Sequence, residues 1–227
     1  MADYGIPERQ DGWAQPAAAL SPVYDQALNF ARVLHAAQRR KSNGAPYLSH
    51  LLEVSGLVLE YGGDEQQAIA ALLHDAIEDQ AEAFGGATLL CDIIAGKFGP
   101  TVLRLVELCS DCAGKPKPAW VWRKQQHVAR LAQASAYECL VPACDKLHNL
   151  RCLNSELRHG DAPFRRLKAG PEDQLHHLAA MASVFQDKGL PMAGDLRHEL
   201  AQLRQLLAER HFMHPPLGQG YAVYAMP

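Results

Sequence analysis

The sequence predicts an all-α protein, on the evidence of its apolar periodicity and of the segments that interrupt it. Apolar residues recur at helical spacing through most of the chain, and no segment keeps the sustained apolar and polar alternation of a half-buried strand. With 227 residues, 48% apolar and 21% charged, the chain has the length and composition of an ordinary globular protein. We therefore predict a single helical domain over residues 1–227.

Proline, glycine and capping residues delimit the first helices. Residues 22–40 begin with a proline after Ser21, which is a favourable N-cap, and they place apolar side chains along one face. A second helix is expected over residues 46–61, stopped by the two glycines that follow. A third begins with Asp64 as its N-cap and carries residues 71–80 on its last turns.

Further helices fit residues 86–98, 100–110, 120–134, 137–157, 171–187 and 193–211. In the last of them, leucines follow one another at intervals of four, three and four residues, as on a packed amphipathic face. That face either packs on the body of the protein or forms an oligomer contact.

Charge and composition exclude several classes of protein. The formal net charge of −3 argues against a broad basic surface for duplex nucleic acid. No apolar run approaches the roughly 18 residues of a membrane span, and the polar N-terminus lacks the layout of a signal peptide. We therefore expect a cytoplasmic protein without a membrane segment. The six cysteines lie in apolar stretches without zinc-finger spacing and are expected to be free thiols.

The stretch ALLHDAIEDQ, residues 71–80, concentrates ionisable side chains directly after an apolar segment. On one helix, His74 and Glu78 are four residues apart, as are Asp75 and Asp79, so the two pairs would share one edge. Three carboxylates packed together repel one another, and a divalent cation is the simplest way to keep them ionised. The stretch therefore predicts a metal site.

Two further donors complete this predicted site. His74 and Asp75 supply one nitrogen and one oxygen, a set that suits Mn²⁺, Fe²⁺ or Zn²⁺ better than Ca²⁺. His50 in PYLSH and Asp145 in CDKLHNLR are the further candidates. Two imidazoles and two carboxylates from three helices would leave coordination positions open for water or substrate, as a catalytic site requires.

Four stretches together resemble a known family: RRKSNGAPYLSH, AALLHDAIED, FGPTVLRLVE and DKLHNLR, in that order. They are similar to HD-superfamily metal phosphohydrolases, and more closely to the alarmone hydrolase domain of RelA/SpoT proteins and of stand-alone small alarmone hydrolases. The resemblance covers roughly residues 25–157. It implies an HD-domain helical bundle with a core at about residues 22–157, a C-terminal helical extension at 158–212 and an irregular tail at 213–227.

The resemblance also implies the chemistry of the site. The family's metal ligands, usually for Mn²⁺, are matched by His50, His74, Asp75 and Asp145. We expect one Mn²⁺ ion in preference to Zn²⁺ or Fe²⁺. Glu78 and Asp79 match the pair that separates the hydrolases from degenerate, synthetase-only relatives. The implied reaction is hydrolytic removal of the 3′-pyrophosphate from (p)ppGpp or (p)ppApp. Glu78, one turn beyond His74, is the residue we expect to activate water, with Asp79 sharing that task or fixing a ligand.

Other residues of the same stretches are expected to contact the substrate. The segment that meets the nucleotide base and its phosphates is matched by Arg40, Lys41 and Ser42, and Tyr47 supports that loop. Positions beside the ribose and phosphates are matched by Asn149 and Arg151. Lys146, next to a predicted metal ligand, either neutralises leaving-group charge or is simply solvated.

The sequence leaves other functions open. The same ligands would serve a phosphohydrolase of ordinary nucleotides, which needs no pocket for two separated phosphate groups. A rival of another class is a non-catalytic, antitoxin-like module that sequesters a nucleotide or a partner protein, although intact Glu78 and Asp79 argue against it because they repel an anionic ligand. The sequence does not decide whether the base is guanine or adenine. A homodimer and an alarmone synthetase counterpart are also open possibilities.

Overall fold

The structure is a computed structural model that describes residues 19–41, 43–111, 117–160 and 163–209. Within these ranges the protein is helical, and the one β-type pairing is an isolated bridge between Arg39 and Pro46. The prediction of an all-α fold is therefore confirmed. The elements are α1 (Pro22–Leu34), α2 (Leu48–Glu60), α3 (Glu65–Leu73), α4 (Ala76–Gln80), α5 (Ala87–Phe98), α6 (Pro100–Cys109), α7 (Trp120–Gln133), α8 (Ala136–Arg158), the 3₁₀ helix η1 (Pro163–Arg166), α9 (Pro171–Asp187) and α10 (Ala193–Glu209).

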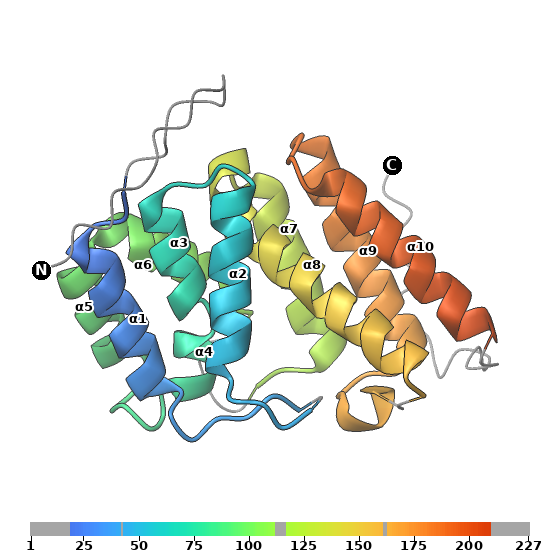
Figure 1. Ribbon diagram of the computed structural model, residues 1–227, viewed down its shortest axis with the longest axis horizontal. Helices are drawn as coiled ribbons and strands as arrows, with labels where there is room; N and C mark the ends of the chain where they lie inside the picture. Colours follow the sequence, from blue (N-terminus) through green and yellow to red (C-terminus); the bar gives the residue numbers. More distant parts are fainter. Residues whose placement is uncertain (1–18, 42, 112–116, 161–162, 210–227) are drawn as a thin grey trace, which may run out of the picture.

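The long helix α8 organises the fold, because helices pack on it from two sides (Figure 1). α2 and α3 lie against it on one side, and α9 and α10 lie against it on the other. α3 also contacts α1 and α6, and every residue from Gln67 to Leu73 is buried. The metal-site motif at residues 71–80 thus begins at the end of a helix enclosed by the core.

The helices begin where the capping residues of the sequence predict. The Ser21 hydroxyl accepts a hydrogen bond from the amide of Val23 before α1. Asp64 caps α3 in a capping box with Gln67, and Ser135 does the same for α8. These bonds satisfy amides that a helix otherwise leaves unpaired at its N-terminus.

Gly63 fixes how closely α2 approaches α8. A Cβ atom added there would lie 2.5 Å from the Cγ1 atom of Val58 and 2.8 Å from the Cδ2 atom of Leu140, so no larger residue fits. Gly62 before it has φ +82°, a conformation that L residues with a side chain avoid. The two glycines therefore both end α2 and turn the chain tightly into α3.

The leucine face of α10 packs within the chain. Leu196, Leu200, Leu203 and Leu207 are all buried, and α10 lies against α8 and α9. Of the two interpretations of this face, the structure supports packing on the body of the protein. None of the described helices has the length and apolar character that crossing a membrane demands.

Two helix boundaries differ from the prediction by more than two residues. α1 ends at Leu34, and the described residues between it and α2 form a loop. This loop is closed by hydrogen bonds from the Arg40 amide to the Ala45 carbonyl (2.8 Å) and from the Tyr47 amide to the Gln38 carbonyl (3.0 Å). The third helix is also interrupted, since α3 ends at Leu73 and α4 begins at Ala76.

The interruption has a local cause. The His74 Nδ1 atom lies 2.8 Å from the carbonyl oxygen of Ala71, the oxygen that would accept from the amide of residue 75 in a continuous helix. The prediction that His74, Asp75, Glu78 and Asp79 share one edge of one helix is therefore wrong. His74 and Asp75 instead occupy the bend between two short helices.

Buried histidines tie stability to pH. The His127 side chain is 2% exposed, and its Nε2 atom lies 2.9 Å from the carbonyl oxygen of Leu108. Burial, with smaller contributions from Lys146 and Lys124, lowers the pKa of His127 to about 3. Because this pKa lies below that of the unfolded chain, the stabilisation is complete above about pH 6.5 and is lost as the pH falls.

We therefore expect His127 to account for about 2 kcal/mol of the unfolding free energy lost between pH 7 and pH 5. Urea unfolding of the parent and of His127→Phe at both values measures this. The variant is expected to be less stable at pH 7, because the Leu108 carbonyl loses its donor, yet to lose less stability on acidification. Equal losses in the two proteins would contradict the role assigned to His127.

Candidate active site

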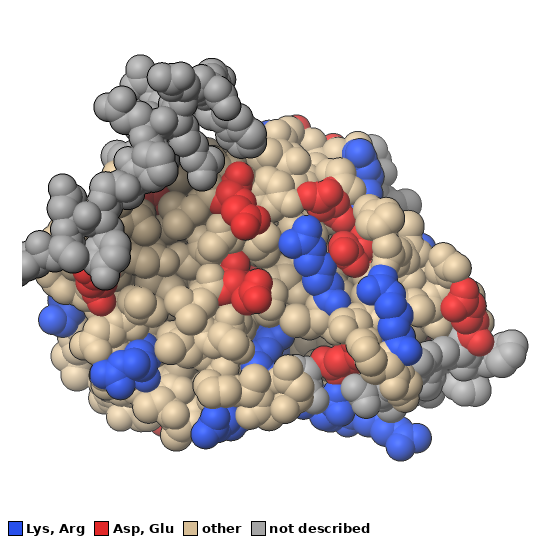
Figure 2. Space-filling view, in the orientation of Figure 1, with Lys and Arg blue, Asp and Glu red and all other residues tan. Residues whose placement is uncertain are grey.

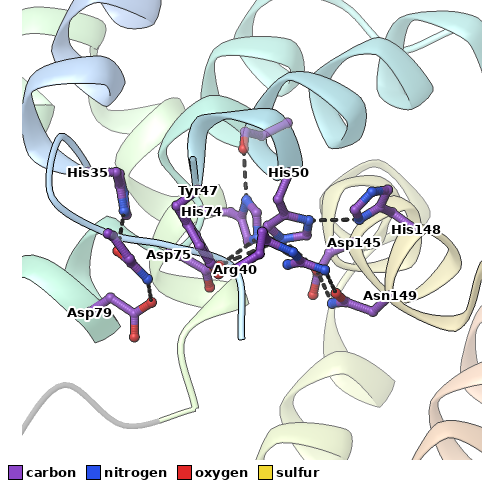
Figure 3. Close-up of polar contacts among 12 residues, drawn as sticks. His35, Arg40, Tyr47, His50, His74, Asp75, Asp79, Asp145, His148 and Asn149 are labelled. Atoms are coloured by element: carbon purple, nitrogen blue, oxygen red, sulfur yellow. Dashed lines mark hydrogen bonds and ion pairs between the residues drawn. The ribbon is translucent and has the colours of Figure 1, made fainter. Parts of the chain in front are cut away.

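Four side chains from three parts of the chain converge on one point: His50, His74, Asp75 and Asp145 (Figure 3). His50 lies in the first turn of α2, and Asp145 lies in the middle of α8. His74 and Asp75 lie in the bend between α3 and α4. Both imidazoles are 1% exposed, whereas the Asp75 side chain is 24% exposed and so faces the outside of the cluster. The four residues predicted as metal ligands are thus brought together.

Their donor atoms are spaced as ligands of one ion would be. The Nε2 atoms of His50 and His74 are 3.2 Å apart, and they lie 3.3 and 3.6 Å from the Oδ1 atom of Asp145. The Asp75 Oδ2 atom lies 3.1 Å from the His74 Nε2 atom and 3.7 Å from the His50 Nε2 atom. Metal–ligand bonds of about 2.1 Å place neighbouring donors roughly 3.0 to 3.4 Å apart. His50, His74 and Asp145 therefore form a donor group compact enough for a single divalent cation, and the Asp75 carboxylate borders it beside the two imidazoles.

The ionised carboxylates of this cluster favour the binding of a cation. Burial opposes charging of His74, yet the charge of Asp75 and hydrogen bonds with both carboxylates raise the pKa of His74 well above its usual value. Burial would also raise the pKa of Asp145, but the charge of Lys146 and hydrogen bonds with the imidazoles hold it well below the usual range. The carboxylates thus stay ionised and attract a cation, which is what a metal site requires.

Each donor is held by a second contact. The Tyr47 hydroxyl donates to the Asp75 Oδ2 atom at 2.5 Å. Lys146 and Asn149 donate to the two oxygens of Asp145, each at 2.5 Å. The Nδ1 atom of His50 lies 2.8 Å from the Nδ1 atom of His148, a contact that the sequence did not predict. The Nδ1 atom of His74 contacts the Ala71 carbonyl oxygen, as described above. His50 and His74 therefore both turn Nε2 toward the cluster and Nδ1 away from it.

Glu78 and Asp79 lie beside this cluster but have different partners. The Glu78 Oε1 atom lies 3.0 Å from the Lys117 Nζ atom, and its Oε2 atom accepts from the amide of Asp111 at 3.5 Å. Asp79 accepts from Gln38 of the α1–α2 loop at 2.7 Å. Desolvation and the charge of Asp75 raise the pKa of Asp79. The predicted catalytic pair therefore consists of one ion-paired carboxylate and one with a raised pKa.

A cavity of about 400 Å³ opens next to the cluster, between the α1–α2 loop, α4, α7, α8, η1 and α9. Both predicted catalytic carboxylates line it. Among the described residues, nine cationic side chains against four acidic ones line its wall. Figure 2 shows Lys and Arg side chains along the lower edge of the molecule, where the α1–α2 loop and η1 lie in Figure 1. A wall with this excess of positive charge suits an anionic ligand.

The structure brings most of the predicted substrate contacts to this cavity. Arg40 donates to the Asn149 Oδ1 atom at 3.3 Å, and its guanidinium carbon lies 5.8 Å from the centre of the Tyr47 ring. Lys41 and Lys146 also line the cavity. Ser42 lies outside the described residues.

Arg151 is placed elsewhere, against the expectation that it lies beside the ribose and phosphates. It does not line this cavity, and its Nε atom lies 3.8 Å from the Glu199 Oε1 atom on α10. The reason is helical geometry, because a residue six positions after Asp145 is rotated by about 120° around the helix axis. Asn149, four positions after Asp145, keeps nearly the same direction.

Comparisons with known proteins agree with this geometry. A family model described as HD domain matches residues 27–168. The chain is 38% identical over 182 residues to the mouse guanosine-3′,5′-bis(diphosphate) 3′-pyrophosphohydrolase MESH1. The matched region covers 74% of this chain and 95% of the mouse protein. It is 33% identical over 133 residues to a Synechocystis protein named "Probable guanosine-3′,5′-bis(diphosphate) 3′-pyrophosphohydrolase". That match covers 57% of this chain but 16% of the Synechocystis protein.

A solved structure has the same fold. It is titled "A metazoan ortholog of SpoT hydrolyzes ppGpp and plays a role in starvation responses". The likeness has a TM-score of 0.56 at 24% identity and covers 88% of this chain and all of the other (100%). The matched model spans more than half of the chain and includes His50, His74, Asp75 and Asp145. The chain therefore belongs to the HD domain family.

Proposed function

We propose that this protein is a metal-dependent hydrolase that removes pyrophosphate from the 3′ position of an alarmone nucleotide, (p)ppGpp or (p)ppApp. The observation that carries the proposal is a donor group that fits a divalent cation, next to a cavity with a cationic wall. The mouse relative named for this reaction supports it, because the similarity extends over 95% of that protein.

We propose Mn²⁺ as the ion, held by His50, His74, Asp75 and Asp145. Two nitrogen and two oxygen donors suit a transition ion of intermediate hardness better than Ca²⁺, which prefers oxygen alone. When bound, such an ion polarises a phosphate oxygen and acidifies a coordinated water. Tyr47 and Asn149 would keep the two carboxylates turned toward the ion through the hydrogen bonds described above.

In this proposal Glu78 takes the proton from the attacking water. The water oxygen bonds to the phosphorus next to the 3′ oxygen, and the bond between that phosphorus and the 3′ oxygen breaks. The products are pyrophosphate and a nucleotide whose 3′ oxygen has taken up a proton. Glu78 is suited to this role because its side chain lines the cavity and lies on α4, directly after the bend that holds His74 and Asp75. Asp79, with its raised pKa, is placed to share a proton with Glu78 or with water.

The cations of the wall would bind the two phosphate groups of such a substrate. Arg40 is expected to be the strongest contact, because Tyr47 and Asn149 already hold its guanidinium in one orientation. Arg40→Ala should raise KM for the substrate about tenfold, the loss of one charge-assisted hydrogen bond. Initial rates over a range of substrate concentrations measure this effect.

Arg151→Ala is the matched control for that experiment. It removes the same type of side chain, but from a position on α8 that does not line the cavity. We expect its KM to stay within about twofold of the parent, since a half-exposed ion pair contributes little. A larger effect of Arg151→Ala than of Arg40→Ala would contradict the placement of the substrate.

The function itself is tested by incubating the protein and Mn²⁺ with ppGpp, ppApp, pppApp and deoxynucleoside monophosphates, and separating the products by anion exchange. The expected result is release of pyrophosphate from at least one alarmone, abolished by a chelator. Phosphate release from the monophosphates alone would favour a phosphohydrolase of ordinary nucleotides. Alarmone binding without turnover would favour a sequestering module. The ratio of kcat/KM for ppGpp and ppApp decides the base preference.

A further inference from the structure

His148 on α8 makes a contact that the proposed reaction does not yet use. Its Nδ1 atom lies 2.8 Å from the Nδ1 atom of His50, and the two ring centres are 4.8 Å apart (Figure 3). The Sγ atom of Cys152, one turn further along α8, lies 3.5 Å from the Nε2 atom and 4.0 Å from the Nδ1 atom of His148. His148 therefore stands behind His50, as seen from the cluster.

The protons of these two rings follow from their geometry. The Nε2 atom of His50 faces His74 and Asp145 at 3.2 and 3.3 Å, so this is the nitrogen that would offer its lone pair to an ion. A neutral imidazole then carries its proton on Nδ1. A hydrogen bond between two Nδ1 atoms forms only if the other atom accepts, so His148 accepts at Nδ1 and carries its proton on Nε2. The Cys152 sulfur lies within 4.0 Å of both nitrogens of this ring.

His50 differs from His74 in what holds its Nδ1–H group. The acceptor for His74 is the carbonyl oxygen of Ala71, at 2.8 Å in the buried helix α3. Such an acceptor is part of the main chain and is insensitive to substitution. For His50 the acceptor is a side chain on another helix, 98 positions along the chain. The orientation of His50 therefore depends on which residue occupies position 148.

We propose that His148 is a positioning residue that holds His50 in the tautomer and the orientation required for metal binding. The proposal rests on the metal site of the proposed function. It concerns the Nδ1 atom of His148, which contacts the ligand His50 and would not contact the ion. Second contacts of this kind change metal affinity by about 10- to 100-fold in other proteins. His148 is not itself in the donor group, which among the described residues comprises His50, His74 and Asp145 within 4.8 Å of one another.

Two substitutions of similar size separate a hydrogen-bonding role from a merely structural one. In His148→Asn, the side-chain oxygen can take the place of Nδ1 and accept from His50. In His148→Leu, a methyl group takes that place and accepts nothing. If His148 only filled space, both substitutions would weaken Mn²⁺ binding, and the polar asparagine would weaken it more. Cys152→Ala is the control for the other neighbour of the His148 ring, because a thiol is a weak hydrogen-bond partner and its loss should matter little.

The measurement is Mn²⁺ binding to chelator-stripped full-length protein by calorimetry, with thermal unfolding of the same samples. We expect His148→Leu to bind about 10- to 100-fold more weakly than the parent, and His148→Asn and Cys152→Ala to stay within a few fold. In the activity assay, the Mn²⁺ concentration for half-maximal rate should rise for His148→Leu, with kcat recovered at saturating Mn²⁺.

Parental affinity in His148→Leu would overturn the proposal, as would equal losses in His148→Leu and His148→Asn. Failure of the parent to bind Mn²⁺ would overturn it together with the metal site. A parent that binds Mn²⁺ but cleaves no alarmone would remove the proposed function and leave the role of His148 standing, provided that the three variants differ in affinity as described.

Discussion

His74→Ala is expected to abolish metal binding and hydrolysis together. The Nε2 atom of His74 lies within 3.6 Å of a donor atom of each of the other proposed ligands, so no other donor can replace it. Incomplete ligand sets bind divalent ions weakly, so we expect activity to fall by several orders of magnitude.

Elemental analysis after gel filtration, paired with the pyrophosphate release assay, checks this result. His198→Ala serves as the matched control, because His198 is an exposed histidine on α10. Since His74 is buried, thermal unfolding must show that His74→Ala still folds. Asp75→Asn provides a second variant that keeps the shape of the site and the acceptor for Tyr47 but removes a charge. Full metal content in His74→Ala would contradict the ligand set.

Glu78→Gln is expected to keep the metal and lose the reaction. The glutamine amide has the size of the carboxylate and can still accept from Lys117 at the position of the present 3.0 Å contact. It cannot take a proton from water. General-base catalysis typically contributes about 10²- to 10⁴-fold, so kcat should fall by that factor while bound Mn²⁺ stays unchanged. Single-turnover rates and elemental analysis measure the two quantities separately.

Glu156→Gln is the control on the same cavity wall. Glu156 forms an ion pair with Arg166 and has no place in the proposed proton transfer, so kcat should stay within a few fold of the parent. Asp79→Asn tests the sharing of the proton, and a smaller loss than for Glu78→Gln is expected. Turnover of Glu78→Gln at the parental rate would assign the water-activating role to another residue.

Much of the fold could be predicted because it depends on local signals. Ser21 and Asp64 mark helix starts through hydrogen bonds to amides two or three residues away. The leucines of α10 mark a buried face through their spacing alone. Such contacts lie within a few residues of one another, so the sequence order already contains them.

The convergence of His50, His74 and Asp145 could be predicted, but the directions of several neighbouring side chains could not. The bend at His74 comes from a side chain that competes for the carbonyl of Ala71, which helical periodicity does not reveal. The displacement of Arg151 from the cavity depends on the rotation of α8 relative to its neighbours, and that rotation is set by tertiary contacts. The contact between His148 and His50 joins positions 98 residues apart. Its only signal was the histidine in DKLHNLR, three residues after Asp145.

The enclosure of α3 by four other helices has a consequence for the dynamics of the molecule. Amide protons in such a segment exchange with solvent only when the molecule opens on the global scale. His74 is attached to this slowly exchanging segment, whereas Arg40 and Lys41 belong to the loop between α1 and α2. Deuterium uptake should therefore be slower in α3, which leads directly into the proposed ligand His74, than in the loop that carries the proposed substrate contacts Arg40 and Lys41.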